Sequence, residues 1–301
     1  MVARTILNIF MQNTPFPVEN AIARCTVRIL AGIDEASLNS VGTGFFYKVV
    51  HPITNLSKTL VVTNKHVISN AKVVRIVISS AEDLSDVNQY GQPVGRQDDV
   101  INWSLAGHLF EHPDAEIDLC GIDVTLPLGN ILHSGRQLRA MFLDSTWLPE
   151  SQDLALVRDI EQVLVVGYPN GMWDQHNNMP VARQGVTATH PLAPYQGKSN
   201  FLIDVAAFGG SSGSPVFTYE TPLFRLAHGG LTPGTRVQFI GVVWGVVEQA
   251  LSGELKQVEI PAVQTTVAIV KASLNLAIAL HSRAVLALDE LVFPGITAGR
   301  G

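Results

Sequence analysis

Short runs of β-branched and aromatic residues follow one another along most of this chain, with turn residues between them. The runs are rich in Val, Ile, Phe and Thr, which favour extended backbone. They are Cys25–Leu30, Thr43–Val50, Thr59–Thr63, Val73–Ile78, Gln162–Gly167, Phe201–Ala206 and Val237–Val247. Helical segments do not alternate regularly with these runs, as they would in a fold of βαβ units. The sequence therefore predicts a mainly β protein whose sheets are closed or packed together.

One segment near the C-terminus departs from this strand pattern. Its apolar residues recur at spacings of three and four, which is typical of an amphipathic helix. These residues are Val263, Val267, Val270, Leu274 and Ile278, while Lys271 and Asn275 fall on other faces. We therefore expect a C-terminal α-helix that packs on the body of the protein.

Chain length and a polar crossing indicate two main units of similar size. A chain of 301 residues is long enough for about two domains. The turn-rich stretch Leu143–Asp153 is the best candidate boundary, and the polar stretch Ser79–Gly107 is expected to be a long loop. We expect four regions, namely an N-terminal segment (1–21), a first β unit (22–147), a second β unit (148–260), and a helix with a tail (261–301).

Composition disfavours several partners and compartments. The chain has 20 Lys and Arg against 26 Asp and Glu, so nucleic acid is not an expected partner. No stretch approaches the roughly 20 apolar residues that cross a membrane, and the N-terminus is a weak signal peptide at best. Cys25 and Cys120 lack metal-ligand spacing, so we expect two buried free thiols, no metal and no cofactor. The expected location is the cytoplasm, with secretion as the alternative.

The sharpest chemical signal is a glycine-rich loop around Ser212. Residues 209–215 read Gly-Gly-Ser-Ser-Gly-Ser-Pro, directly after an apolar run and directly before another. Glycine allows positive φ and leaves backbone amides open, as a nucleophilic serine and its oxyanion require. Ordinary Gly/Ser loops are also common in β proteins, so this loop alone does not decide between structure and catalysis.

A second signal is His66, which follows the β-branched run Leu60–Thr63 after two polar residues. A general base should stand at the rigid end of such an element. A single histidine is more often a surface or core residue. The combination with the Ser212 loop favours catalysis.

These motifs resemble those of the trypsin-like (chymotrypsin-fold) serine peptidases, in particular the bacterial and housekeeping branch. The residues are Gly-Thr-Gly-Phe-Phe at 42–46, Thr-Asn-Lys-His-Val at 63–67 and Gly-Ser-Ser-Gly-Ser-Pro at 210–215, in that order. The resemblance spans about Ile22 to Gln249. It implies two antiparallel six-stranded β-barrels, an active site in the cleft between them, and the catalytic order His, Asp, Ser.

The resemblance also implies a role for each catalytic residue. Ser212 would be the nucleophile and His66 the general base. The family places its acid before a short apolar strand, which favours Asp118; Asp153, in Asp-Leu-Ala-Leu-Val, is the competitor. The remaining candidate acids, interpreted as turn and strand-flank residues, are Asp114 and Asp123.

Further residues are implied for the oxyanion and the substrate. The backbone N–H groups of Gly210 and Ser212 would form the oxyanion hole. Ala206 stands six residues before the nucleophile, where specificity for Lys or Arg would need an acid, so a small or apolar substrate residue is expected instead. The strand expected to bind extended substrate contributes Val243, Trp244 and Gly245.

The function expected from this resemblance is that of a serine endopeptidase acting on a protein or peptide, restrained by a regulatory protein partner. Ser211 replaces the Asp that precedes the nucleophile in digestive members, so their zymogen activation is not expected. The alternative is an inactive pseudo-protease that serves as a binding module. An α/β-hydrolase is disfavoured, because an apolar strand rather than a helix follows the Gly-x-Ser-x-Gly string at 209–213.

Overall fold

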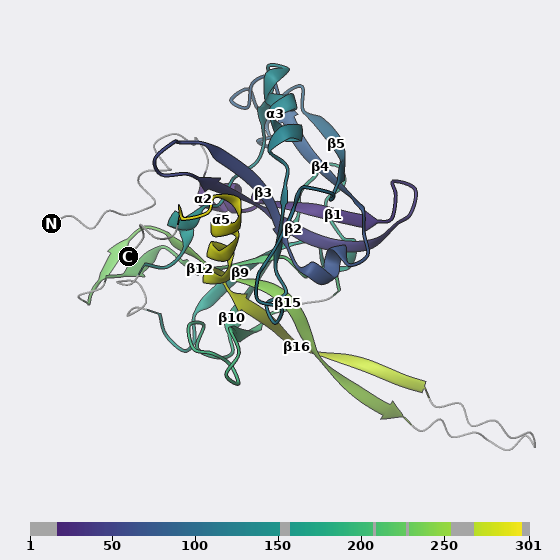
Figure 1. The fold of residues 1–301 in the computed structure, drawn as a ribbon. Helices are drawn as coiled ribbons and strands as arrows, with labels where there is room; N and C mark the ends of the chain where they lie inside the picture. The colour runs from purple at the N-terminus through teal and green to yellow at the C-terminus, as the bar shows by residue number, and fades with distance from the viewer. Residues whose placement is uncertain (1–16, 151–156, 207–208, 227–228, 254–267, 297–301) are drawn as a thin grey trace, which may run out of the picture.

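The computed structural model describes residues 17–150, 157–206, 209–226, 229–253 and 268–296. Strands dominate, and they form one β unit in each half of the chain (Figure 1). The mainly β architecture predicted from the sequence is confirmed.

The N-terminal half forms a sheet of eight strands. Seven follow the order β5-β4-β1-β2-β3-β7-β6, and β8 pairs with β4. The strands are β1 (Thr26–Gly32), β2 (Leu38–Val50), β3 (Ser57–Thr63), β4 (Val73–Ala81), β5 (Gln97–Ser104), β6 (Leu109–Glu111), β7 (Cys120–Asp123) and β8 (Gln137–Leu138). The hydrogen-bonded path ends at β5 and β6, whereas a closed barrel of six strands was expected for this half.

The loop expected over Ser79–Gly107 is shorter than predicted, because Gln97–Ser104 forms β5 and pairs with β4. The strand at 97–104 was not expected from the sequence because many of its side chains are polar. Several of them form hydrogen bonds with β4. Ser79 donates to Asp98 at 2.7 Å and Ser80 to Asp99 at 2.6 Å. Cross-strand polar pairs of this kind stabilise an edge strand without giving it an apolar pattern.

The C-terminal half forms the expected closed barrel of six strands, in the order β10-β11-β16-β15-β12-β9. A separate small sheet pairs β13 (Leu223–Arg225) with β14 (Leu231–Pro233). The barrel strands are β9 (Gln162–Gly167), β10 (Val181–Thr187), β11 (Asn200–Asp204), β12 (Pro215–Glu220), β15 (Arg236–Gly253) and β16 (Ala268–His281). Beyond the barrel, β15 and β16 continue as a long antiparallel hairpin that projects from the body (Figure 1).

The helix expected from Val263 to Ile278 is wrong. Residues 263–267, with Val263 and Val267, lie outside the described residues, and residues 268–278 belong to β16. This strand pairs with β11 on one side and β15 on the other, so tertiary pairing overrides the local spacing of its apolar residues. The barrel therefore extends to His281, past the expected boundary at 260. A C-terminal helix does exist, but it is α5 (Leu286–Val292).

The other helices among the described residues are short. Two are α-helices, α2 (Val18–Ile22) and α3 (Thr125–His133). The 3₁₀ turns are η1 (Lys65–Ile68), η2 (Ser145–Trp147), η3 (Pro169–Gly171) and η4 (Ser282–Val285). No described helix is long and apolar enough to cross a membrane.

One apolar core joins the two halves. Phe45 of β2 packs edge-on against Phe239 of β15, with ring centroids 5.2 Å apart, and Phe217 of β12 lies 5.9 Å from the same Phe239 ring. Leu288 and Val292 of α5 belong to the same cluster. The C-terminal helix therefore covers a core that both β units share.

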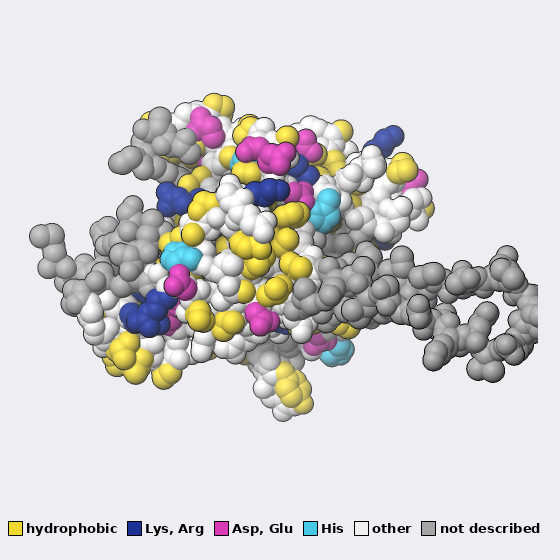
Figure 2. Space-filling model, turned by 90° about the horizontal axis from the view of Figure 1, so that it is seen from below, with side chains coloured by type: hydrophobic (Ala, Val, Ile, Leu, Met, Phe, Trp, Pro, Cys, Tyr) yellow, Lys and Arg dark blue, Asp and Glu magenta, His cyan; other side chains and the backbone are white. Residues whose placement is uncertain are grey.

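The two cysteines lie in the interior, and charged side chains are spread over the surface. Cys25 and Cys120 are buried and free, as predicted, and burial raises the pKa of both thiols. On the face shown in Figure 2, Lys and Arg side chains lie in small separate groups with acidic side chains between them. This face offers no continuous cationic surface.

Because Phe239 contacts aromatic rings from both halves, we expect Phe239→Ala to lower the free energy of unfolding by about 3–5 kcal/mol. Ile53→Ala is the control, since Ile53 is 84% exposed, and should change that free energy by less than about 0.5 kcal/mol. Urea denaturation measures both. Equal effects of the two variants would contradict the shared core.

Candidate active site

The end of β3 and the start of β7 bring His66 and Asp118 together. Thr63 pairs with Cys120 across these strands, so the residues just after β3 lie beside those just before β7. His66 donates its backbone N–H to Asp118 Oδ1 at 3.1 Å, and its Nδ1 lies 2.5 Å from Oδ2. Asn64 also donates to the backbone carbonyl of Asp118 at 2.5 Å. Two contacts therefore hold the Asp118 carboxylate against His66, and a third holds the backbone of Asp118.

This pair has the electrostatics of a general base and its orienting acid. Burial alone would raise the pKa of Asp118, but hydrogen bonds and charge attraction from His66 outweigh it, so the pKa lies below its usual value. The carboxylate is therefore ionised near neutral pH. An ionised carboxylate beside Nδ1 favours the imidazole tautomer that carries its proton on that nitrogen. The His66 side chain is 49% exposed, against 24% for Asp118, so substrate can reach the imidazole.

The loop before β12 takes a conformation that requires its glycines. Gly210 has a φ of +79° and Gly213 a φ of +86°, a region that side chains with a Cβ rarely adopt. A Cβ at Gly213 would also stand 1.9 Å from the carbonyl oxygen of Thr43. These two glycines therefore let the Ser212 turn pass close to β2.

Two carbonyl groups of this loop accept hydrogen bonds from residues outside it. Asn170 N–H donates to the carbonyl of Gly209 at 2.5 Å, and Thr43 N–H donates to that of Ser212 at 2.9 Å. Within the described ranges, no hydrogen bond uses the N–H of Gly210 or of Ser212. Both amides are left available for a developing oxyanion.

Thr43 connects the two halves at this point. Its hydroxyl donates to the carbonyl of Gly210 at 2.9 Å and accepts the N–H of Tyr168 at 3.0 Å. The carbonyl of Thr43 accepts the hydroxyl of Thr63 at 2.7 Å, three residues before His66. The sequence analysis assigned Thr43 no role, although its position between Gly42 and Gly44 is a usable signal for close backbone approach.

The expected substrate residues lie beside this loop. Val243 of β15 donates to the carbonyl of Ser214 at 2.9 Å and accepts the N–H of Gly213 at 2.8 Å. An irregularity in the β15–β16 pairing between Val243 and Gly245 sets Trp244 outside the regular register. Ala206 is exposed. Its carbonyl accepts a hydrogen bond from Arg183 Nη1, a contact the sequence did not indicate.

The other candidate acids do not contact His66 in the described part of the chain. Asp123 forms an ion pair with Lys58 at 2.9 Å. Asp114 accepts the N–H of Glu116 with its carboxylate at 2.9 Å. Asp153 lies outside the described residues. Asp118 is thus the candidate acid that the structure places against His66.

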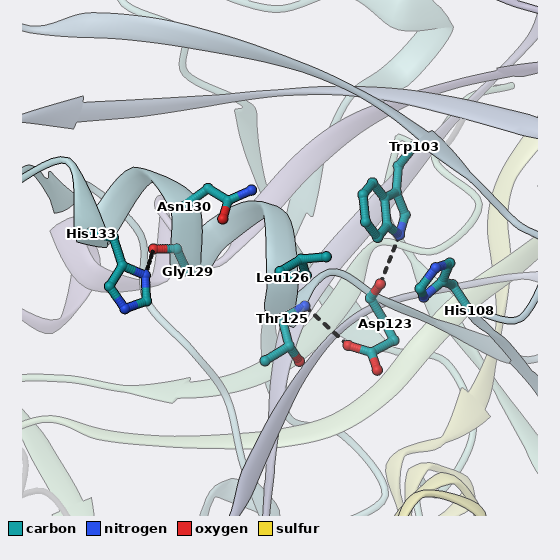
Figure 3. A pocket seen from close by; sticks show the side chains of 8 residues that line it. All are labelled: Trp103, His108, Asp123, Thr125, Leu126, Gly129, Asn130 and His133. Atoms are coloured by element: carbon teal, nitrogen blue, oxygen red, sulfur yellow. Dashed lines mark hydrogen bonds between the residues drawn. The ribbon is translucent and has the colours of Figure 1, made fainter.

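A cavity of about 350 Å³ lies away from these residues, beside α3. In it the Trp103 indole donates to the Asp123 carbonyl at 2.9 Å, and the Asp123 carboxylate accepts the N–H of Thr125 at 3.0 Å (Figure 3). The lining residues are Trp103, His108, Asp123, Thr125, Leu126, Gly129, Asn130 and His133. None of them belongs to the candidate catalytic set. In the part of the chain that the structure describes, no cluster of three or more His, Cys, Asp or Glu side chains could hold a metal ion.

Residues 42–223 match the family model described as a trypsin-like peptidase domain. The chain belongs to this family. The match contains His66, Asp118 and Ser212, and it supports peptidase activity. It ends before β15 and β16, the two strands that complete the barrel.

Solved structures of serine proteases are also similar at low sequence identity. The serine endoprotease from Yersinia pestis is 15% identical with a TM-score of 0.43, over 96% of this chain and 69% of that chain. The Rv3671c protease from M. tuberculosis in its active form is 15% identical with a TM-score of 0.43, over 90% and 81%. An inactivated protease paralogue from the scabies mite is 12% identical with a TM-score of 0.42, over 91% and 98%. Among curated proteins, none matches this peptidase domain significantly.

We expect Thr43→Val to destabilise the protein by about 2–4 kcal/mol, because it leaves the Gly210 carbonyl and the Tyr168 N–H without their partner. Thr43→Ser keeps the hydroxyl and should lose much less. Urea denaturation of both variants measures the difference. If the two substitutions were equally destabilising, the methyl group rather than the hydroxyl would be the important part of Thr43.

Proposed function

We propose that this chain is a serine endopeptidase that hydrolyses peptide bonds through Ser212, His66 and Asp118. The observation that supports this most directly is the His66–Asp118 contact, in which Nδ1 and Oδ2 lie 2.5 Å apart. Such a contact orients an imidazole for base catalysis. Thr43 of β2 forms hydrogen bonds both with the glycine turn that carries Ser212 and with Thr63, three residues before His66.

The proposed reaction has two halves. His66 Nε2 takes the hydroxyl proton of Ser212 as Oγ attacks the scissile carbonyl carbon, and it then gives that proton to the leaving amine. The C–N bond breaks and an acyl-enzyme ester remains. His66 next removes a proton from water, whose oxygen attacks the ester, and returns the proton to Ser212 as the acid product leaves. Asp118 stays ionised and stabilises the imidazolium in both halves.

The oxyanion would be bound by the backbone N–H groups of Gly210 and Ser212. Removing one such donor in another serine hydrolase costs about 2.7–4 kcal/mol of transition-state stabilisation. Extended substrate would add to β15 at Trp244 and Gly245, with backbone hydrogen bonds that tolerate many sequences. Val243 would position this segment, because its own N–H and carbonyl bind Ser214 and Gly213. This mechanism uses no metal or cofactor.

A fluorophosphonate probe tests the nucleophile. We expect the native protein to be labelled on Ser212, because an activated serine attacks phosphorus as it attacks a carbonyl. Ser212→Ala should abolish labelling. Ser214→Ala is the matched control, since Ser214 is fully buried, and should be labelled like the native protein. Absence of labelling on folded native protein would support the inactive binding module instead.

Replacing the acid tests the triad assignment. We expect Asp118→Asn to lower kcat about 10⁴-fold, as the corresponding change does in the best-studied triad, because the imidazole then takes the wrong tautomer. Asp153→Asn should leave kcat within about twofold of the native value. Rates on a general protein substrate at neutral pH measure both. The reverse pattern would exchange the two assignments.

A further inference from the structure

Arg183 places a positive charge on the inner face of the C-terminal barrel. It lies directly opposite Val165 where β10 pairs with β9, and residues opposite each other in a pair share a face. Val165 is fully buried in the barrel core. The neighbours of Arg183 along β10, Ala182 and Gln184, are exposed. The Arg183 side chain is therefore directed toward the barrel interior.

The guanidinium is held at one edge only. Its Nη1 donates to the carbonyl of Ala206. The nitrogens of the other edge, Nε and Nη2, are buried and have no hydrogen-bond partner among the described residues. Over the same residues, no acidic side chain forms an ion pair with Arg183.

This arrangement is unfavourable for a side chain with a purely structural role. Burial lowers the pKa of Arg183 to about 10, so the group still carries its charge at neutral pH. A buried cation without a counter-charge, and buried donors without acceptors, both oppose folding. A bound anion would supply both the counter-charge and the acceptors.

The positions of the two unpaired nitrogens indicate which kind of anion would bind. Nε and Nη2 form two parallel donors that match the two oxygens of a carboxylate. The carbonyl that fixes the guanidinium belongs to Ala206, an exposed residue six positions before Ser212. The resemblance to trypsin-like peptidases implies that this position contacts the side chain of the substrate residue whose carbonyl Ser212 would attack.

We propose that Arg183 is a specificity-determining residue that binds the carboxylate of a substrate Glu or Asp immediately before the scissile bond. This inference rests on the proposed peptidase function and names its substrate class. It replaces the small or apolar substrate residue expected from Ala206. Because the free edge is covered in the unliganded protein, the carboxylate reaches it by displacing the groups that cover it.

Peptides that differ only at the residue before the scissile bond test this assignment. With Glu or Asp there, kcat/KM of the native enzyme should exceed that for Gln, Leu or Lys by about 10- to 100-fold, the range expected for hydrogen bonds to a charged group. Arg183→Gln should reduce Glu and Gln peptides to within about twofold of each other. Arg183→Lys should keep part of the preference, because an ammonium retains the charge but not the paired donors.

The control removes the same charge from the surface of the same barrel. Lys198 is exposed, so Lys198→Gln should leave the preference for Glu unchanged. Labelling by an uncharged fluorophosphonate should proceed at similar rates in the native protein and in Arg183→Gln. If Arg183→Gln does not fold, the native Glu-to-Gln ratio and the Arg183→Lys variant decide.

The outcomes separate the two proposals. Native protein that is labelled but cleaves Glu and Gln peptides equally overturns the role of Arg183 and leaves the peptidase assignment intact. Equal loss of kcat/KM on every peptide in Arg183→Gln also overturns it, because that pattern reports a structural role. Failure of the native protein to be labelled overturns the proposed function, and this inference with it.

Discussion

The hydrogen bonds of Thr43 are the connection on which the arrangement of the site depends. Its N–H and hydroxyl bind two carbonyls of the loop that carries Ser212, and its own carbonyl binds Thr63 at the end of β3. One residue of β2 thus fixes the distance between a loop of the barrel and the strand end that precedes His66. Phe45, two residues further along β2, enters the shared core against Phe239. The hydrogen bonds that position the site and the apolar contacts of the shared core therefore both involve β2.

This close approach also explains where the chain needs glycine. A Cβ at Gly42 would lie 2.5 Å from Val67 Cγ1, and a Cβ at Gly44 would lie 2.5 Å from Val61 Cγ1. Gly42 thus lets β2 lie close to the η1 turn, Gly44 lets it lie close to Val61 of β3, and Gly213 lets the Ser212 loop approach Thr43. Substrate-binding peptidases need such rigidity because small displacements of a reacting group greatly reduce the rate.

The features that the sequence predicted are those with strong local signals. Ser212 lies among glycines and His66 follows a β-branched run, so both could be proposed from neighbouring residues alone. Asp118 needed the resemblance to the family, since its partner is 52 positions away and nothing local separates it from Asp153. The segment at β16 was mistaken for a helix because its pairing with two other strands, rather than its own periodicity, decides its structure. Arg183 was missed because only barrel closure turns its side chain inward.

Asp118 and Arg183 are both partly buried, but they differ in how far the protein itself satisfies their hydrogen bonds. Asp118 has its counterpart within the protein, where hydrogen bonds from His66 and its backbone N–H saturate both oxygens. Arg183 has one carbonyl and an unused pair of donors. A protein can satisfy a buried charge from its own groups, as with Asp118, and a charge left unsatisfied lowers stability without benefit unless a ligand completes it. On this reasoning the barrel would retain Arg183 because a substrate carboxylate completes its hydrogen bonds.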